Sequence, residues 1–314
     1  RRRRIGRYAS VAAGIVLLLG VGLGLRQVVP AWMPDDEYAE AVVHPGKAQA
    51  MLYLSSGVMV PIDSSGKKLT EFDGTAIEVH ENGSMSYKAS SREGDGVKEG
   101  MNHLVVPRKG EFRLTLADGT KVWLNSESEL EYPVLFGKGK RVVKLTGEAF
   151  FEVTKDASRP FIVETNDIRT RVLGTSFNIK AYQNEPAIAT TLFTGKVEVA
   201  LLTDTLRRVV LVPGKQADLN LQTNHLSVGE VNLEHVIAWK EGMFMFNKEN
   251  IEVVTRQIER WYGVKFIYEA GCHKYYTFNG YLSKDESLKT ILDALTFTGG
   301  PKFKIDENVV YVKD

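Results

Sequence analysis

The dipeptide Gly174-Thr175, within the stretch TRVLGTSFNIKAY, could carry out chemistry on its own backbone. A threonine hydroxyl can attack the carbonyl carbon of the preceding residue, and hydrolysis of the resulting ester would cut the chain. Glycine in front of the threonine leaves that carbonyl unhindered, and backbone strain would favour the acyl shift. The same dipeptide occurs at Gly74-Thr75 and Gly119-Thr120, so the residues alone favour a glycine-assisted bulge between two strands over a cleavage site.

Other side chains that commonly carry catalysis or bind metals are dispersed along the sequence. The six histidines are His44, His80, His103, His225, His235 and His273, and their spacing matches no metal-ligand pattern. Cys272 is the only cysteine, so no disulfide forms within the chain. The sequence holds no phosphate-binding glycine loop, no GxSxG and no HExxH. We therefore predict no metal, no cofactor and no enzyme activity; the one candidate reaction is a single-turnover self-cleavage at Gly174-Thr175.

A glycan hydrolase is an alternative hypothesis. Such enzymes need two facing carboxylates and aromatic platforms for the sugar. Trp123, Trp239, Trp261 and Tyr132 could supply the platforms. No pair of carboxylates stands out in an apolar setting, however, and these aromatic residues are better explained as core residues. The net charge of +1 also gives no basic surface for nucleic acid.

The stretch Tyr8–Leu25 reads YASVAAGIVLLLGVGLGL and carries no charged residue. As a helix it would be about 27 Å long, close to the roughly 30 Å hydrocarbon core of a bilayer. Arginines at 1–4 and 7 precede it and acidic residues at 35–37 follow, which orients the N-terminus toward the cytoplasm. A cleavable signal peptide is the alternative, but the apolar run is long for one and no clear Ala-x-Ala cleavage site follows it. We predict a cytoplasmic stub at 1–7, a transmembrane helix at 8–25 and a linker at 26–40, in a single-pass inner-membrane protein whose remaining domains are periplasmic.

The region that follows has the pattern of an all-β protein. Residues 45–62 and 107–124 match at a fixed offset, and each alternates apolar and polar residues around a turn at Gly57 or Gly119. Each is expected to form a β-hairpin, and the residues on the inner face of the second are Leu114, Leu116, Val122 and Leu124. Short strand signals then recur up to residue 222, with Gly147, Gly174, Gly195 and Gly214 expected to separate strands.

We divide this region into a β-rich part at 41–103, with an exposed loop at 89–100, and a β domain at 104–222. The absence of long helical patterns predicts a sandwich or a β-roll.

In the last part, 240–314, the spacing of apolar residues changes from the alternation typical of strands to include helical spacing. Asn247 is expected to cap a helix that ends at Gly263, with its apolar face formed by Ile251, Val254, Ile258 and Trp261. A capping box at Ser283 and Glu286 is expected to begin a second helix. The order β-α-β-β-α-β-β predicts a small α/β domain with both helices packed on one sheet.

Four segments of the β domain resemble FecR-family anti-sigma factors of the Bacteroidetes type. They are GEFRLTLADGTKVWLNSES (110–128), LTGEAFFEVTKDASRPFIVET (145–165), VLGTSFNIKAY (172–182) and LFTGKVEV (192–199). The C-terminal part, from AWKEGMFMF through IERWYGVKF to LTFTGGPKFKI, is similar to the module that follows FecR in these proteins. That module itself resembles the βαββαβ short N-terminal signalling domain of secretins and TonB-dependent receptors.

The resemblance implies an inner-membrane sensor that relays a signal from a TonB-dependent outer-membrane transducer to an extracytoplasmic-function sigma factor. The genes controlled would serve uptake of iron carriers or glycans. Implied partners are the periplasmic signalling domain of the transducer, the sigma factor and the site proteases that release it. Some relatives cut themselves at a Gly-Thr that matches Gly174-Thr175.

The family's sigma-binding segment does not precede Arg1, so we expect this sequence to be a piece of a longer protein. A membrane-anchored periplasmic protein that binds glycans or siderophores is the alternative function. If the relay reading holds, an exposed strand edge of the C-terminal domain is expected to accept a strand of the transducer. The candidate partner-binding residues are Met243, Phe244, Phe246, Val264, Phe266 and Tyr268.

Overall fold

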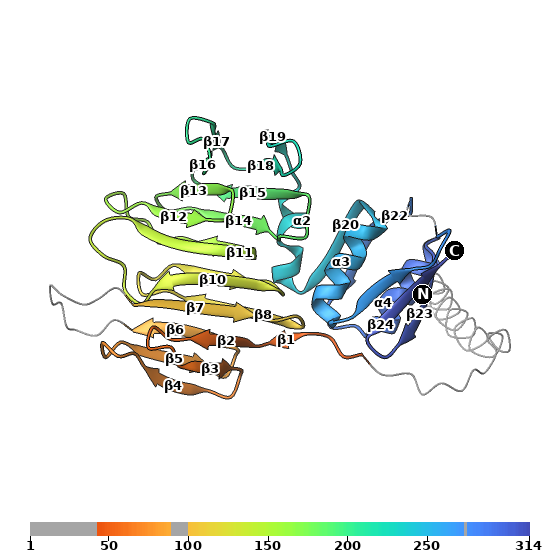
Figure 1. Ribbon diagram of the computed structural model, residues 1–314, viewed down its shortest axis with the longest axis horizontal. Coiled ribbons are helices and arrows are strands. Elements are labelled where there is room, and N and C mark those ends of the chain that lie inside the picture. Colours follow the sequence, from red (N-terminus) through yellow and green to blue (C-terminus); the bar gives the residue numbers. More distant parts are fainter. Residues whose placement is uncertain (1–42, 89–99, 273–274) are drawn as a thin grey trace, which may run out of the picture. The chain divides into compact units, whose positions relative to one another are not determined.

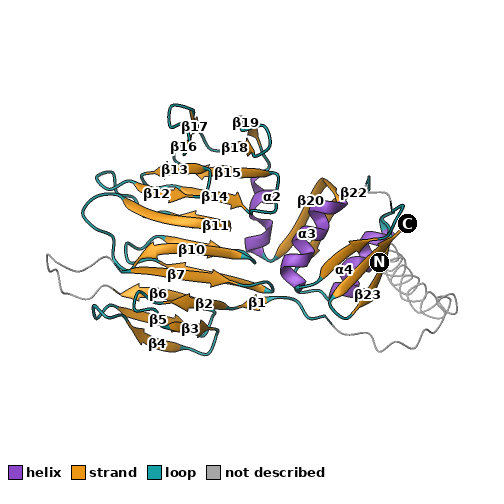
Figure 2. Cartoon of the chain, in the orientation of Figure 1, coloured by secondary structure: helices purple, strands orange, loops and turns teal. Residues whose placement is uncertain are grey.

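The computed structural model describes residues 43–88, 100–272 and 275–314. The predicted cytoplasmic stub, transmembrane helix and linker, and nearly all of the loop predicted at 89–100, lie outside these residues. Within them, no helix combines the length and the apolar character needed to cross a bilayer. The chain from Ala41 to Asp314 forms one compact unit, in which a large β domain is followed by a small α/β domain (Figures 1 and 2).

Within the described residues, the β domain contains nineteen strands that hydrogen bonds join into one assembly. They are β1 (Lys47–Ala48), β2 (Ala50–Tyr53), β3 (Met59–Ile62), β4 (Lys67–Thr70), β5 (Ala76–His80), β6 (Ser84–Lys88), β7 (Met101–Val106), β8 (Gly110–Thr115), β9 (Lys121–Leu124), β10 (Ser128–Pro133), β11 (Arg141–Glu152), β12 (Phe161–Glu164), β13 (Ile168–Val172), β14 (Ser176–Ala181), β15 (Ala187–Thr194), β16 (Val197–Leu201), β17 (Arg208–Leu211), β18 (Lys215–Asn220) and β19 (His225–Glu230).

Strand pairing separates this assembly into two layers. The first runs β3-β2-β7-β10-β11-β12-β13-β16-β17. The second runs β4-β5-β6-β8-β9-β11-β14-β15-β18-β19. Because successive groups of strands alternate between the layers, the chain winds along the stack as a β-roll (Figure 1). The all-β prediction is confirmed.

Gly147 marks the point where β11 passes from the first layer to the second. Its φ is +92°, and a Cβ there would lie 2.4 Å from the Ser128 hydroxyl oxygen and 2.7 Å from the Glu127 carbonyl oxygen. The prediction that Gly147 separates two strands is therefore wrong. It lies inside one twelve-residue strand, and glycine is needed because the two layers share that strand at a point of close backbone approach.

The two predicted hairpins are confirmed as β2–β3 and β8–β9. Gly57 and Gly119 have φ of +85° and +82°, the left-handed conformation that these turns require. The inner-face residues of the second hairpin, Leu114, Leu116, Val122 and Leu124, are at most 1% exposed. They belong to one apolar core that lies along the whole β domain.

The stretch between these hairpins lies in the part predicted as β-rich, but its three strands, β4, β5 and β6, were not predicted individually. The β4–β5 turn repeats the chemistry of the β8–β9 turn. Asp73 accepts a hydrogen bond from the backbone N–H of Thr75 at 2.8 Å, as Asp118 does from Thr120 at 2.9 Å. Such Asx turns are a local backbone preference, which a reading of hydrophobic pattern alone passes over.

A short helical segment connects the two domains. It consists of α2 (Leu233–Ile237) and the 3-10 helix η1 (Ala238–Glu241). Asn232 caps α2 by accepting from the N–H of Glu234, and Gly242 ends η1 with φ of +75°. Five residues are too few to show a helical period in the sequence, so this segment was not predicted.

The C-terminal domain has the predicted order of elements. They are β20 (Met243–Asn250), α3 (Ile251–Tyr262), β21 (Lys265–Tyr268), β22 (Thr277–Ser283), α4 (Leu288–Phe297), β23 (Lys302–Asp306) and β24 (Val309–Lys313). The prediction of one sheet is wrong, because the strands form a β20-β22 pair and a separate β21-β24-β23 sheet. The apolar faces of α3 and α4 meet both sheets in a second core.

Both predicted helix starts are corrected by several residues. Asn247 lies within β20, and Asn250 caps α3. Ser283 ends β22, and Ser287 caps α4 by accepting from the N–H of Thr290. In each case another capping residue lies three or four positions further on, and the length of the preceding strand decides which one is used. The end of α3 at Gly263, with φ of +68°, is as predicted.

Candidate functional site

Gly174 and Thr175 connect β13 to β14. Gly174 has φ of +154°, and a Cβ there would lie 2.6 Å from the Cα of Lys155, so only glycine fits. Thr175 is 4% exposed, and its hydroxyl oxygen has no hydrogen-bond partner among the described residues. The register of β14 and β15 shifts directly after it, between Ser176 and Phe177. The dipeptide thus combines the features of a bulge with an unengaged, buried hydroxyl.

Most of the predicted partner-binding side chains lie inside the C-terminal core. Phe244, Phe246, Val264 and Phe266 are between 1% and 7% exposed, whereas Met243 and Tyr268 are half-buried. A partner could therefore reach this domain through main-chain groups and the outward residues of its edge strands, not through these four side chains.

Two edge strands of the C-terminal domain differ in availability. Among the described strands, β21 pairs with β24 alone, and the N–H of Phe266 donates to the Glu259 carboxylate at 2.7 Å, so part of its other edge is already occupied. Among the same strands, β22 pairs with β20 alone, and Tyr281 on it is 73% exposed. A Cβ built at Gly280 of β22 would meet no atom within 4 Å, so a partner can approach β22 at Gly280 and Tyr281.

The contact between the β domain and the C-terminal domain is built around two buried cations. The first is Arg260 of α3, which is 4% exposed. Its Nη1 lies 2.8 Å from Glu185, its Nη2 donates to Asn184 at 3.0 Å, and its guanidinium stacks 3.6 Å from the centre of the Tyr182 ring. The carbonyl oxygen of Arg260 also accepts the N–H of Lys109 at 2.8 Å.

The carboxylate of Glu185 is the main partner of this arginine. Burial alone would raise the pKa of Glu185, but the charges of Lys180 and Arg260 and their hydrogen bonds outweigh it and hold the pKa below its usual value. Lys180 is paired with Glu185 at 2.7 Å. The carboxylate therefore stays ionised between two cations.

The second buried cation is Lys284, which follows β22 and is 2% exposed. Its Nζ lies 2.8 Å from Glu111 of β8, donates to the carbonyl oxygen of Trp239 at 3.2 Å, and sits 3.7 Å from the Trp261 ring centre. Burial lowers the pKa of Lys284, and the Glu111 carboxylate opposes that shift. Each cation thus extends from the C-terminal domain to a carboxylate of the β domain.

Beside these ion pairs, the outer face of the second β layer carries a row of polar side chains. Glu148 of β11 accepts from the amide of Asn125 at 2.9 Å and from that of Asn178 on β14 at 3.0 Å. On the next strands, Thr191 donates to Gln216 at 2.6 Å and Gln216 donates to Asp218 at 2.8 Å. Burial raises the pKa of Asp218. An outward sheet face normally meets water, but here it faces another part of the chain.

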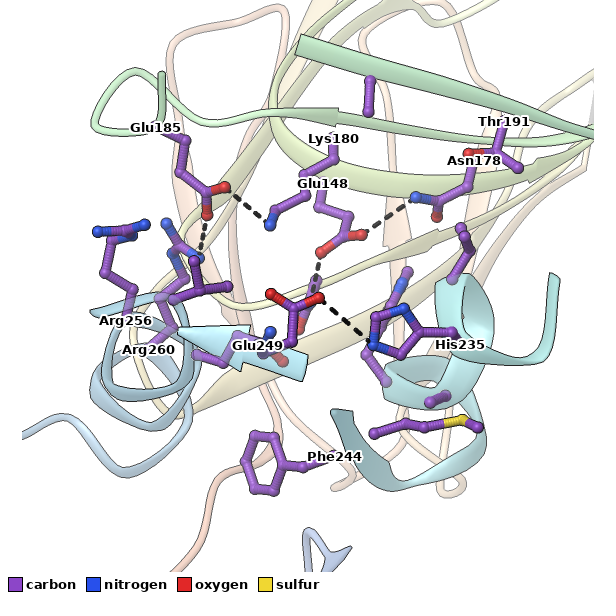
Figure 3. Close-up of a pocket in the computed structure, with 18 of the residues that line it drawn as sticks. Glu148, Asn178, Lys180, Glu185, Thr191, His235, Phe244, Glu249, Arg256 and Arg260 are labelled. Atoms are coloured by element: carbon purple, nitrogen blue, oxygen red, sulfur yellow. Dashed lines mark hydrogen bonds and ion pairs between the residues drawn. The ribbon is translucent and has the colours of Figure 1, made fainter. Parts of the chain in front are cut away.

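A cavity of about 420 Å³ lies between this polar row and the segment formed by α2, η1, β20 and α3. Figure 3 shows Glu148, Asn178, Lys180 and Glu185 on one side of it and His235, Glu249, Arg256 and Arg260 on the other. Across the described part of the chain, no group of three or more His, Cys, Asp or Glu residues could hold a metal ion. The site is an interface between the two domains that encloses a polar cavity.

Comparison with known families assigns both halves of this interface to one kind of protein. Residues 102–198 match the family described as "FecR protein", and residues 243–312 match "FecR, C-terminal". The chain belongs to the FecR family, which confirms the resemblance seen in the sequence.

Solved structures agree with this assignment. Two crystal structures of a "putative anti-sigma factor" from Parabacteroides distasonis are similar to this chain, each with 31% sequence identity. They cover 68% of this chain and 99% of their own, with TM-scores of 0.63 and 0.62. No curated protein matches the chain.

Sequence reasoning missed both buried cations. Arg260 lies beside the apolar stripe of α3, where an arginine is usually a solvated charge, and Lys284 was placed within a capping box. No local signal marks Arg260 as buried, because Trp261, which follows it, belongs to the apolar face already predicted for this helix.

Proposed function

We propose that the chain is the sensor part of an inner-membrane anti-sigma protein. In this proposal the C-terminal domain receives a signal from the periplasmic signalling domain of a TonB-dependent outer-membrane transducer. A cytoplasmic segment N-terminal to the predicted helix at 8–25 holds an extracytoplasmic-function sigma factor, and site proteases release it. Membership of the FecR family and the similarity to proteins named as anti-sigma factors support this reading.

The observation that carries the proposal is the docking of the C-terminal domain onto the β domain through Arg260 and Lys284. A partner that pulls on or displaces the C-terminal domain must separate buried cations from carboxylates of the β domain. Separating a buried cation from its carboxylate costs free energy, so the two domains respond together up to a threshold and then separate. Such a contact can convert binding at one domain into a change at the other, without any catalytic residue.

The transducer is proposed to dock on the exposed strand edges of the C-terminal domain. A photo-crosslinking amino acid placed at Tyr281 of β22 and, separately, at Ile267 of β21 tests this in the full-length protein. These side chains are 73% and 39% exposed, so neither replacement disturbs the core. Crosslinks to the transducer's signalling domain are expected from at least one of these positions.

The matched controls are Phe72 and Leu206, which are 96% and 91% exposed and lie in the β domain. Equal crosslinking from these positions, or none from Ile267 and Tyr281, would remove edge docking from consideration.

Location in the membrane has a separate test. Cys272 is replaced by serine, and a single cysteine is introduced at exposed Lys302 in one variant and at Gly6 in another. A membrane-impermeant maleimide is expected to label Lys302→Cys in intact spheroplasts and Gly6→Cys only after lysis. Labelling of both in intact spheroplasts, or of neither, contradicts the single-pass arrangement.

Self-cleavage at Gly174-Thr175 is a second proposed property. It is favoured by the buried Thr175 hydroxyl, which lacks a partner among the residues that the structure describes. Because β13 and β14 on either side of the cut pair with other strands, the fragments would stay together in the native state. Denaturing gels of the purified wild type are expected to show two fragments that Thr175→Ala abolishes. Thr120→Ala, at the matched Gly119-Thr120, is the control and should still give both fragments. A wild type that stays uncut would show that Gly174-Thr175 is a bulge between two strands and not a cleavage site.

A further inference from the structure

The cavity between the two domains contains polar atoms that the described chain does not satisfy. Asn178, on the β-domain side, is 2% exposed. Its amide nitrogen donates to Glu148 at 3.0 Å, and a carboxylate can only accept, so the orientation of the amide is fixed. The amide oxygen of Asn178 is buried and has no donor.

The opposite wall presents two unsatisfied donors. The indole N–H of Trp239 in η1 and the Nε–H of Arg256 in α3 are both buried, and neither has an acceptor among the described residues. Both residues line the cavity. Figure 3 shows Arg256 beside Arg260 at one corner of the cavity.

Arg256 differs from its neighbours in charge pairing. The other lysines and arginines that line the cavity are Lys180, Arg260 and Lys284, and each lies within 3 Å of a carboxylate. No ion pair joins Arg256 to any described residue, and a buried polar group without a partner costs about 1–3 kcal/mol. Together with the Nε of Arg260, which lies 3.5 Å from Glu127, four such atoms belong to residues that line this one cavity, so a ligand there could supply the missing partners.

The arrangement defines a complementary ligand. Arg256 calls for a carboxylate, Trp239 for a hydroxyl or carboxylate oxygen, and the Asn178 oxygen for a hydroxyl or amino donor. Because Glu148, Asp218 and Glu249 also line the cavity, a ligand with a single negative charge suits it better than a multiply charged phosphate. Met243, Met245 and Val253 supply apolar contacts.

We propose that this cavity binds a small hydroxylated organic acid, of the sugar-acid class, with its carboxylate on Arg256 and a hydroxyl on the Asn178 oxygen. The ligand contacts both domains at once, so its binding stabilises their docked arrangement. The consequence for signalling rests on the proposed function; the binding itself does not.

Calorimetry and thermal unfolding of the full-length protein in detergent test the proposal. The probes are D-glucuronate, D-galacturonate and D-gluconate, with D-glucose (hydroxyls without a carboxylate) and acetate (a carboxylate without hydroxyls) as controls. Saturable binding and a raised unfolding temperature are expected with at least one of the three acids and with neither control.

Arg256→Gln and Asn178→Ala are each expected to weaken binding of that acid roughly tenfold or more, since a charge-assisted or buried hydrogen bond is lost. No ion pair joins Arg256 to a described residue, so its variant should unfold at the wild-type temperature, which keeps the test valid if Asn178→Ala is unstable. Arg208→Gln, at a guanidinium that is 61% exposed on the β domain, is the matched control and should bind as the wild type does.

The proposal is overturned if none of the three acids binds the folded wild type, which would mean that water alone fills the cavity. It is equally overturned if Arg256→Gln binds as tightly as the wild type, or if glucose or acetate binds as well as the acids. Because no transducer or sigma factor takes part in these measurements, their result is independent of the proposed signalling role.

Discussion

The core of the β domain and the interface between the two domains are both buried, yet opposite interactions hold them. The β core is a continuous apolar cluster in which Phe151 and Phe177 stack at 5.1 Å between ring centres. The interface instead contains two buried cations, a row of amides and carboxylates and a polar cavity.

This difference indicates that the β-domain core stays intact while the interface between the two domains can open. Apolar burial is non-directional and holds under any condition that leaves the chain folded. Buried ion pairs depend on exact partners, so that removing one partner leaves a large uncompensated cost. The β domain is therefore expected to behave as a fixed body, and the interface as the contact that can be opened.

The largest expected effect comes from breaking the apolar side of this comparison. Phe151→Ala removes a ring that is fully buried, and we expect a loss of about 3–5 kcal/mol in the free energy of unfolding. Urea unfolding followed by tryptophan fluorescence measures it. Phe72→Ala is the matched control, since Phe72 is 96% exposed and its replacement should change stability by less than about 0.5 kcal/mol. A loss below about 1 kcal/mol for Phe151→Ala would contradict a rigid core.

Next in size is a backbone test in the strand that both layers share. Gly147 and Gly57 have similar φ, +92° and +85°, but a Cβ on Gly57 would meet no atom within 4 Å. Gly57→Ala is expected to cost about 1 kcal/mol from the left-handed conformation alone. Gly147→Ala adds a clash with the Ser128 and Glu127 backbone, so its total should reach about 3 kcal/mol. Equal losses in urea unfolding would show that β11 adjusts freely at the crossing point.

The interface is tested by removing each buried cation. Arg260→Met is expected to cost about 2 kcal/mol, less than a fully isolated pair would, because Glu185 keeps Lys180 as a partner. Lys284→Met should change stability by less than about 1 kcal/mol, since Glu111 is 40% exposed and can return to water. Calorimetric unfolding gives both values, and limited proteolysis of the connection at 231–242 reports undocking. If Lys284→Met undocks the domains and Arg260→Met does not, then Lys284 contributes more than Arg260 to holding the domains together, contrary to this prediction.

The smallest expected effect is a difference in pH dependence between two carboxyls of the cavity. The pKa of Glu185 is lowered in the folded chain, so its contribution to stability is complete above its ordinary pKa near 4.5 and is lost as the pH falls through the folded value. The destabilisation caused by Glu185→Gln should therefore be largest at neutral pH and shrink in acid.

For Asp218 the sign is opposite. Burial raises its folded pKa above the ordinary 3.8, so the folded chain holds this proton more tightly and stability from this group falls as the pH rises through that window. Asp218→Asn should stabilise the protein by less than about 1 kcal/mol at pH 7, and the gain should vanish below pH 3.8. Thermal unfolding from pH 3 to 7 measures both variants, and parallel curves for the two would show that the interface does not control these groups.

The family, the all-β character and the order of elements in the C-terminal domain could be predicted from the sequence because each has a local cause. Alternating residues such as Leu114 and Leu116 define a strand face without knowledge of what covers it. Gly119 defines its turn, and Gly263 the end of a helix, through backbone conformation alone. These signals persist in any tertiary arrangement.

Tertiary structure alone decided the rest. The sequence did not show that Gly147 lies inside a strand, that Asn250 and not Asn247 caps α3, or that the two helices face two sheets. Arg260, Lys284 and Arg256 look alike in the sequence, as cations on or near amphipathic helices. Their surroundings differ because the distance to a carboxylate on another domain, which no local pattern encodes, determines whether each cation forms an ion pair.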